Sequence, residues 1–265
     1  MTQIGETLPT ALGEGGIAAI RARNSEVVVR CPDHGEFTRN DLLKLSMWED
    51  VCPECQRAKE EVIQREQRIN TAAHHFKTAS GVPLRFLEAS FDGYRPGSEN
   101  ARKILEHMRD YAENFGQNHK LGRSLILCGK AGTGKTHLSC ALLRSLAFDQ
   151  GVMGKYATAY RAVQEVRESY GSRDVSELRA MEAFIKPDLL VLDEIGAQYG
   201  TDSEHLILFT IINGRYEAMK PTIVISNLNV DGMKKYLDER GYDRLRENGG
   251  ALLVFDWGSH RQGSR

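Results

Sequence analysis

The chain has 265 residues, of which 41% are hydrophobic and 27% are charged, and its formal net charge is −1. This composition is typical of a soluble globular protein, and the length allows one sizeable α/β core plus a smaller module. The near-neutral charge excludes a protein coated in positive charge, so any nucleic-acid contact must come from a local patch. Without an apolar stretch long enough to span a membrane, or a secretory signal over residues 1–20, we expect a cytoplasmic protein with no membrane partner.

The first 25 residues are rich in glycine, threonine and alanine and show little hydrophobic periodicity. Such a segment cannot bury enough apolar surface to offset the entropy lost on ordering. We therefore expect residues 1–25 to be a poorly ordered leader, and we assign no function to it.

Three cysteines and one histidine form two spaced pairs after this leader. Cys31 and His34 make a C-x2-H pair, and Cys52 and Cys55 make a C-x2-C pair. Each pair lets two ligands reach one ion from a tight turn, and four soft or borderline ligands suit tetrahedral Zn²⁺. Since no position remains for water, the site would be structural; the alternative is chance spacing. The sequence predicts a small zinc-ribbon-like module over residues 26–58.

A charged run over residues 56–76 follows the cysteines. Its apolar side chains fall at helical spacing: Val62, Ile69, Ala73 and Phe76. This pattern predicts a mostly solvated helix with one narrow apolar stripe. We expect a linker helix over residues 59–82, broken by the sequence Gly-Val-Pro, and a larger domain over residues 83–265.

The most informative motif fills every fixed position of the phosphate-binding pattern G-x-x-x-x-G-K-[ST]. Its glycines let backbone N–H groups turn inward around a phosphate. A predicted strand over 123–128 precedes it and a predicted helix over 137–148 follows, as the motif requires. Lys135 would bridge the β- and γ-phosphates, and the Thr136 hydroxyl would ligate Mg²⁺. The predicted nucleotide-binding residues are Gly129, Lys130, Ala131, Gly132, Thr133, Gly134, Lys135, Thr136 and His137.

After this loop, strand-like and helix-like segments alternate along the chain, and one of the predicted helices lies around residues 233–240. The predicted strands lie at 123–128, 154–158, 189–192, 222–225 and 252–255. Alternation of this kind predicts a parallel sheet flanked by helices.

Two of these strands end in polar residues at the edge of the sheet where ligands bind. Asp193 and Glu194 follow one strand directly, and Asn227 comes shortly after another. We expect Asp193 to hold Mg²⁺ and Glu194 to orient or deprotonate the attacking water. The alternative is an acidic strand end without chemistry. Asn227 could donate a hydrogen bond to the water or the γ-phosphate, although an asparagine after a strand is more often a turn former.

The order strand-loop-Lys, strand-Asp-Glu, strand-Asn is similar to that of the AAA+ ATPases. Within that class the chain resembles the DnaC-type helicase-loader family, whose close relatives include the IstB-type transposition ATPases. The resemblance covers roughly residues 84–261. Besides the phosphate loop, it includes Ser90-Phe91-Asp92-Gly93-Tyr94, Asp193-Glu194-Ile195-Gly196, Ser226-Asn227, Asp243-Arg244-Leu245-Arg246 and Phe255-Asp256-Trp257-Gly258-Ser259-His260-Arg261.

The resemblance implies a P-loop AAA+ domain that hydrolyses ATP slowly and only when assembled into a ring or spiral. An arginine acting on a neighbouring subunit's nucleotide would be Arg244, with Arg240 second, and Arg261 matches the sensor that reaches the γ-phosphate within its own subunit. The resemblance also implies single-stranded DNA binding, with Tyr170 as the base-stacking residue. The alternative for Tyr170 is a core tyrosine on a solvated helix.

Three functions remain open on the sequence alone. The leading one is an ATP-dependent loader of a hexameric replicative helicase of the DnaB type, binding ATP, Mg²⁺ and single-stranded DNA during replication initiation. The second is a transposition helper ATPase of the IstB type. The third is a nucleotide-dependent adaptor that switches partners without appreciable turnover.

Overall fold

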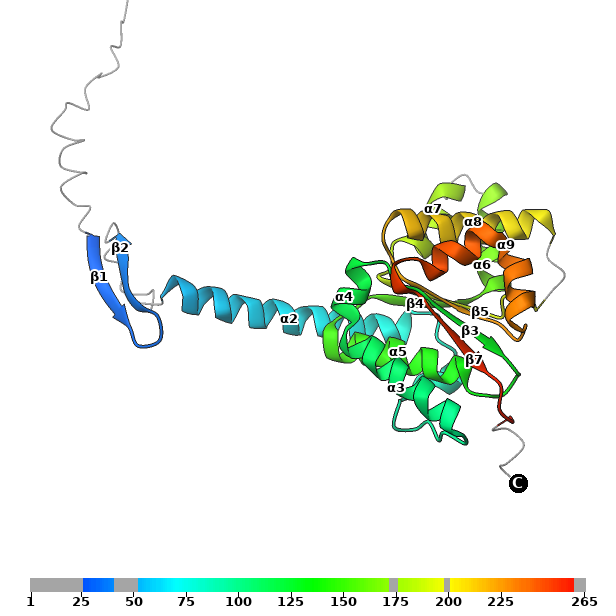
Figure 1. Cartoon of the computed structure of the whole chain (residues 1–265). Helices are drawn as coiled ribbons and strands as arrows, with labels where there is room; N and C mark the ends of the chain where they lie inside the picture. Colours follow the sequence, from blue (N-terminus) through cyan, green and yellow to red (C-terminus); the bar gives the residue numbers. More distant parts are fainter. Residues whose placement is uncertain (1–25, 41–51, 172–175, 198–200, 260–265) are drawn as a thin grey trace, which may run out of the picture. The chain divides into compact units, whose positions relative to one another are not determined.

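The computed structural model describes residues 26–40, 52–171, 176–197 and 201–259. The chain separates into two compact units, Met1–Gln64 and Arg65–Arg265, and the cartoon in Figure 1 shows the elements of both. The predicted leader and Arg261 lie outside the described residues.

The first unit contains an antiparallel hairpin. Strand β1 (Glu26–Cys31) pairs with strand β2 (Gly35–Asn40), so that Cys31 stands opposite Gly35 at the turn. Gly35 has a φ of +83°, a left-handed conformation that a glycine adopts without a steric cost. Helix α2 (Pro53–Thr78) begins directly after Cys52 and continues into the second unit. The hairpin turn and the start of α2 therefore carry the two predicted ligand pairs.

The second unit is built on a five-stranded sheet. Its strands are β3 (Leu125–Gly129), β4 (Gly154–Thr158), β5 (Leu189–Asp193), β6 (Thr222–Ile225) and β7 (Ala251–Phe255). They pair in the order β4-β5-β6-β3-β7, and every pair is parallel. The predicted parallel five-stranded fold is confirmed. Because all strands point the same way, the residues that follow them gather at one edge of the sheet.

The helical elements of this unit connect the strands. After α2 they are η1 (Leu84–Phe86), α3 (Glu99–Glu113), α4 (Phe115–Lys120), α5 (Lys135–Gln150), α6 (Ala159–Glu168), η2 (Ser169–Gly171), α7 (Glu177–Ile185), α8 (Asp202–Glu217), α9 (Val230–Arg246) and η3 (Glu247–Gly249). Among the described residues, no helix has both the length and the apolar character needed to cross a bilayer.

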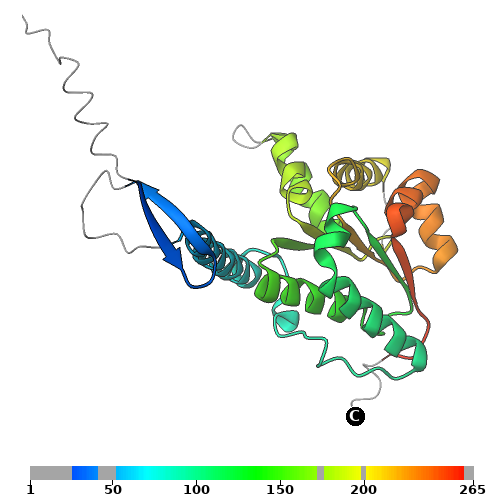
Figure 2. The same ribbon diagram turned by 60° about the vertical axis from the view of Figure 1, so that its left-hand side comes forward.

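Each face of the sheet packs against its own set of helices. Along β3, Leu125 and Leu127 join the core formed with the end of α2 and with α3, α4 and α5. The alternate residues Ile126 and Cys128 join the core formed with α6, α7, α8 and α9. Figures 1 and 2 show α3 and α5 on one side of the sheet and α6 to α9 on the other. The inner strands β3, β5 and β6 are buried on both faces and read as nearly continuous apolar runs, which is why they were predictable.

Helix α9 differs from its prediction, which placed a single helix around residues 233–240. The observed element runs over Val230–Arg246, and Asp238 interrupts it with a φ of +56° and a ψ of 172°. The Asp238 carboxylate accepts a hydrogen bond from the Gly241 N–H at 2.8 Å, which caps the second helical segment. This cap explains how a second helical segment begins after Asp238 and continues to Arg246, beyond the predicted end near residue 240.

A buried arginine ties several connections together. Arg215 in α8 is fully buried, and its guanidinium donates to the carbonyls of Phe184, Ile185, Pro187 and Pro221 and to Thr222 Oγ1. Burial lowers the pKa of Arg215 below its usual range. The guanidinium satisfies carbonyls at the end of α7 and ahead of β5 and β6, which stabilises the fold far from the phosphate loop.

Candidate nucleotide site and Cys/His cluster

The phosphate-loop motif joins the end of β3 to the first turn of α5. Gly129 and Gly134 have φ values of +121° and +98°, which L residues rarely adopt. A Cβ on Gly134 would lie 2.5 Å from Tyr94 Cε2, so that position also lacks room for a side chain. The loop therefore leaves free N–H groups at the start of α5, as anion binding requires.

Lys135 lies at the centre of this loop. Its side chain is buried, and Nζ donates to the carbonyl oxygens of Gly129 at 2.8 Å and Lys130 at 2.7 Å. Burial lowers the pKa of Lys135, while the nearby Asp193 carboxylate opposes that effect. The ammonium thus occupies the mouth of the loop, within reach of any phosphate bound there.

Asp193 collects three hydrogen bonds at the end of β5. Its Oδ2 accepts from Thr136 Oγ1 at 2.7 Å and from the Tyr156 hydroxyl at 2.8 Å, and its Oδ1 accepts from the Glu194 N–H at 2.7 Å. Burial, followed by the charge of Asp193, raises the pKa of Tyr156 well above its usual value, so its hydroxyl stays a donor. A hydroxyl and a carboxylate oxygen in contact are the ligand types that Mg²⁺ prefers.

A pocket of about 260 Å³ opens over these groups. It is lined by Arg85, Phe86, Ala131, Gly132, Thr133, Gly134, Lys135, Thr136, His137, Asp193, Glu194, Ile225 and Asn227. Glu194 and Asn227 are exposed in it. The structure therefore brings the loop together with the three polar residues predicted from the strand ends.

Two aromatic side chains, from segments before and after the core of the domain, form hydrogen bonds to the phosphate loop. The Tyr94 hydroxyl and Trp257 Nε1 donate to the Thr133 carbonyl at 3.1 Å and 3.2 Å. His137, predicted among the nucleotide-binding residues, has Nε2 3.0 Å from the Ser90 carbonyl. Tyr94 and Trp257 fall in segments that carried the family resemblance, but the sequence did not indicate this contact.

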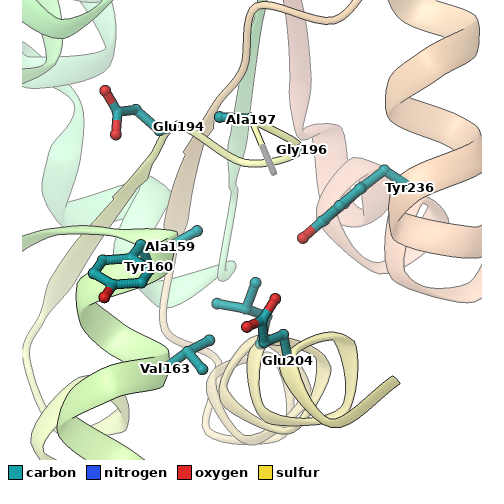
Figure 3. A pocket seen from close by; sticks show the side chains of 9 residues that line it. Ala159, Tyr160, Val163, Glu194, Gly196, Ala197, Glu204 and Tyr236 are labelled. Carbon is teal, nitrogen blue, oxygen red and sulfur yellow. The ribbon is translucent and has the colours of Figure 1, made fainter. Parts of the chain in front are cut away.

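The turn after β5 borders a second pocket on its other side. In Figure 3 the Tyr236 hydroxyl and the Glu204 carboxylate point into this pocket from α9 and α8, while the Glu194 carboxylate points away. Glu194 has a φ of +60° and Gly196 one of +77°, so the turn is tight. A Cβ on Gly196 would lie 2.5 Å from Leu228 Cδ1. The turn holding Glu194 is thus confined by packing on this side.

Arg240 and Arg244, two of the arginines predicted to act on nucleotide, do not line the phosphate pocket of their own chain. Arg240 is exposed on α9. The Arg244 guanidinium lies 5.3 Å from the ring centre of Phe209 and 5.4 Å from that of Tyr216, and its Nη1 is buried without a described partner. Arg261 lies outside the described residues, so its placement stays a prediction.

Tyr170, the predicted DNA contact, lies away from the nucleotide pocket in η2. Its side chain is 54% exposed, and its hydroxyl donates to Glu177 Oε1 at 3.3 Å. The ring is therefore not a core residue, and its face is available to solvent.

The four predicted zinc ligands converge in the first unit. Their ligand atoms all lie within 4.8 Å of one another. Cys31 Sγ is 3.6 Å from Cys55 Sγ and 3.7 Å from His34 Nδ1, and Cys55 Sγ is 3.3 Å from His34 Nδ1. In a tetrahedral zinc site, ligand atoms stand roughly 3.6–3.8 Å apart, from bond lengths of about 2.0–2.3 Å. The spacing of this cluster fits a zinc ion at its centre.

The surroundings of the cluster also suit a metal. Backbone N–H groups of Asp33 and His34, together with the His34 side chain, lower the pKa of Cys31 to about 7, which favours the thiolate form that metals bind. Glu54 Oε2 lies 3.7 Å from His34 Nε2, the ring nitrogen facing away from the cluster. A carboxylate in that position orients a metal-binding histidine. The sequence analysis missed Glu54.

Comparison with known proteins identifies the family of the larger unit. Residues 58–253 match the family described as IstB-like ATP binding protein. The chain belongs to this family. Curated relatives include the replicative helicase loader DnaC of Buchnera aphidicola subsp. Acyrthosiphon pisum, 33% identical over 69% of this chain and 73% of that protein. The DnaC protein of Escherichia coli K12 is 31% identical over 75% of this chain and 79% of that protein.

Solved structures agree on the architecture. The crystal structure of the DnaC helicase loader has a TM-score of 0.59 to this chain and 24% identity, covering 65% of this chain and 99% of that one. At this identity the likeness shows the fold, which is that of an AAA+ domain in the IstB-like family. The match to the family begins at residue 58, so the Cys/His cluster lies ahead of it.

We propose that this cluster binds one structural zinc ion. Elemental analysis of the purified chain should then find about one zinc per chain, and Cys55→Ser should lose it. Cys140→Ala, which removes a buried thiol in α5, should keep it. Because structural zinc contributes about 10–16 kcal/mol in comparable small modules, chelation should unfold the hairpin. Hairpin amide signals that stay unchanged in nuclear magnetic resonance spectra after complete metal removal would contradict the proposal.

Proposed function

We propose that the chain is an ATP-dependent loader that delivers a ring-shaped replicative helicase to DNA in the cytoplasm of a bacterial cell. The 2.7 Å hydrogen bond from Thr136 to Asp193 carries the nucleotide part of this proposal, because it joins both predicted magnesium ligands. The partner part rests on the curated relatives at 31–33% identity whose name is replicative helicase loader. A DnaB-type helicase is the partner that the resemblance implies.

Triphosphate binding would use the groups around the loop. Backbone N–H groups of the loop and of the first turn of α5 would surround the β-phosphate, and Lys135 Nζ would leave the Gly129 and Lys130 carbonyls for phosphate oxygens. Mg²⁺, when bound to Thr136 and Asp193, would supply charge neutralisation at the β- and γ-phosphates. Tyr156 would keep the Asp193 carboxylate oriented through its hydrogen bond.

Hydrolysis would depend on Glu194 and Asn227, which are exposed in the same pocket. Glu194 would accept a hydrogen bond from the attacking water, and Asn227 would donate one to the water or to the γ-phosphate. Their exposure leaves room for a water between them and the nucleotide. Turnover would be slow, because no arginine of α9 reaches the pocket within the chain.

Assembly would complete the site. Arg244, or Arg240, would be presented to the nucleotide of a neighbouring copy, where a guanidinium neutralises charge developing on the transferred phosphoryl group. The exposed side chain of Arg240 is free to do so directly. Arg244 would first leave the rings of Phe209 and Tyr216, whose hold on a partly desolvated cation is worth about 1–2 kcal/mol. Arg261 would reach the γ-phosphate of its own chain.

Single-stranded DNA would be bound near η2. Two arginines of α6, the helix that precedes η2, have carboxylate partners: Arg161 Nε lies 3.3 Å from Glu165 Oε1, and Arg167 Nη1 lies 3.2 Å from Glu204 Oε1. These pairs weaken the local positive potential, so base stacking on Tyr170 would contribute a larger share of the affinity.

Replacing Tyr170 tests this contact. Tyr170→Ala should weaken binding of a single-stranded oligonucleotide by about 1–3 kcal/mol, because a stacking surface is lost. Tyr170→Phe keeps the ring and removes only the hydroxyl contact to Glu177, so it should bind as the wild type does. Fluorescence anisotropy at several salt concentrations measures both. Salt-sensitive binding that is unchanged in Tyr170→Ala would rule out the stacking role.

Replacing Glu194 tests the hydrolytic role. Glu194→Gln should reduce ATP turnover by about 100-fold or more while leaving ATP affinity within about twofold, since the amide keeps the shape but not the basicity. Glu168→Gln, an exposed carboxylate on α6, is the matched control and should turn over normally. Phosphate release with single-stranded DNA present is the measurement. A wild type that binds ATP and never hydrolyses it would favour the adaptor function instead.

The match to the family named for IstB favours a transposition helper as the second candidate. Such a protein would share the ATPase core but would bind a transposase. Co-purification from the native host separates the two: recovery of a helicase supports the loader, and recovery of a transposase without a helicase overturns it.

A further inference from the structure

The segment between α2 and α3 crosses the edge of the sheet where Asp193 lies. At its start, the Ser80 carbonyl accepts a hydrogen bond from the Tyr156 N–H at 2.7 Å, along the outer edge of β4. In the register of the sheet, Thr158 at the end of β4 stands opposite Asp193 at the end of β5. The segment therefore approaches the nucleotide pocket from the side of the magnesium ligands.

The same segment is anchored again beyond η1. The Ser90 carbonyl contacts His137 in the first turn of α5, and the Tyr94 hydroxyl contacts the loop at Thr133. Because the segment is anchored on both sides of η1, this short helix packs against α5. Its residues Arg85 and Phe86 consequently line the nucleotide pocket together with Lys135, although they lie about fifty residues earlier in the chain.

Arg85 brings a cation into this pocket. Its side chain is exposed, and its guanidinium lies 5.1 Å from the ring centre of Phe86, which supports it from one side. In the described part of the chain Arg85 forms no ion pair, although Asp193 and Glu194 line the same pocket. Its hydrogen-bond donors are thus available to a ligand.

The charges of the pocket explain why a free guanidinium at Arg85 would matter for binding a triphosphate. Among its lining residues, Lys135 and Arg85 carry permanent positive charges, and Asp193 and Glu194 carry negative ones. Lys135 alone would leave the protein groups net negative around a strongly anionic triphosphate. The guanidinium of Arg85 would offset this negative charge, and its planar shape can donate two parallel hydrogen bonds to phosphate oxygens.

We propose that Arg85 is a nucleotide-binding residue that contacts the terminal phosphate of ATP held in its own chain. Because η1 approaches from the β4 edge of the sheet, next to the proposed magnesium ligand Asp193, we place Arg85 at the terminal phosphate. The inference rests on the proposed ATP binding and assigns a role to a residue outside every predicted motif.

The test compares two nucleotides in the full-length chain. Isothermal titration calorimetry with a non-hydrolysable ATP analogue and with ADP, both with Mg²⁺, should show that Arg85→Ala weakens the analogue by about tenfold or more and ADP by less than about twofold. Arg85→Lys keeps the charge but lacks the planar guanidinium, so its affinity for the ATP analogue should lie between that of the wild type and that of Arg85→Ala. Arg102→Ala, an exposed arginine on α3, is the matched control and should bind both nucleotides normally.

Thermal denaturation should give the same midpoint for all four proteins, because Arg85 and Arg102 are exposed. Equal loss of analogue and ADP affinity in Arg85→Ala, or no loss of either, would overturn the role of Arg85 while leaving the proposed function intact. A wild type that binds neither nucleotide would overturn both.

Discussion

The hydrogen bond between the Thr136 hydroxyl and the Asp193 carboxylate connects the start of α5 to the end of β5. Asp193 is only 4% exposed, and a buried carboxylate is costly unless its oxygens are satisfied. The Tyr156 hydroxyl and the Glu194 N–H meet that requirement, so β4, β5 and α5 are all positioned by one side chain. Nucleotide binding, hydrolysis and the proposed role of Arg85 all depend on this arrangement.

The nucleotide pocket has a buried floor and an exposed rim. Buried Lys135 and Asp193 form the floor, where their positions are set by packing, and exposed Glu194 and Asn227 stand at the rim. In the proposed function, floor residues would hold the nucleotide, whereas rim residues would act only when a water and a second chain complete the site. A loader that uses hydrolysis as a timer needs that division.

Much of the fold could be predicted because its signals are local. The strands at Gly154–Thr158 and Thr222–Ile225 have the predicted bounds, the second because a short apolar run buried on both faces ends at polar residues. The loop and the Cys/His spacing are likewise encoded within a few residues. Tyr156 and Glu54 could not be predicted, because each acquires its partner only through tertiary packing. Arg85 likewise enters the nucleotide pocket only through the tertiary fold, and a lone tyrosine, arginine or glutamate carries no motif.

Electron paramagnetic resonance of Mn²⁺ in place of Mg²⁺ tests the central claim most directly. In the wild type, adding an ATP analogue should create one tight Mn²⁺ site per chain, because Thr136, Asp193 and the phosphates would together hold the ion. Asp193→Asn and Thr136→Ala should each weaken that site by about tenfold or more. Tight Mn²⁺ binding that is unchanged in both variants, with nucleotide bound, would contradict the account.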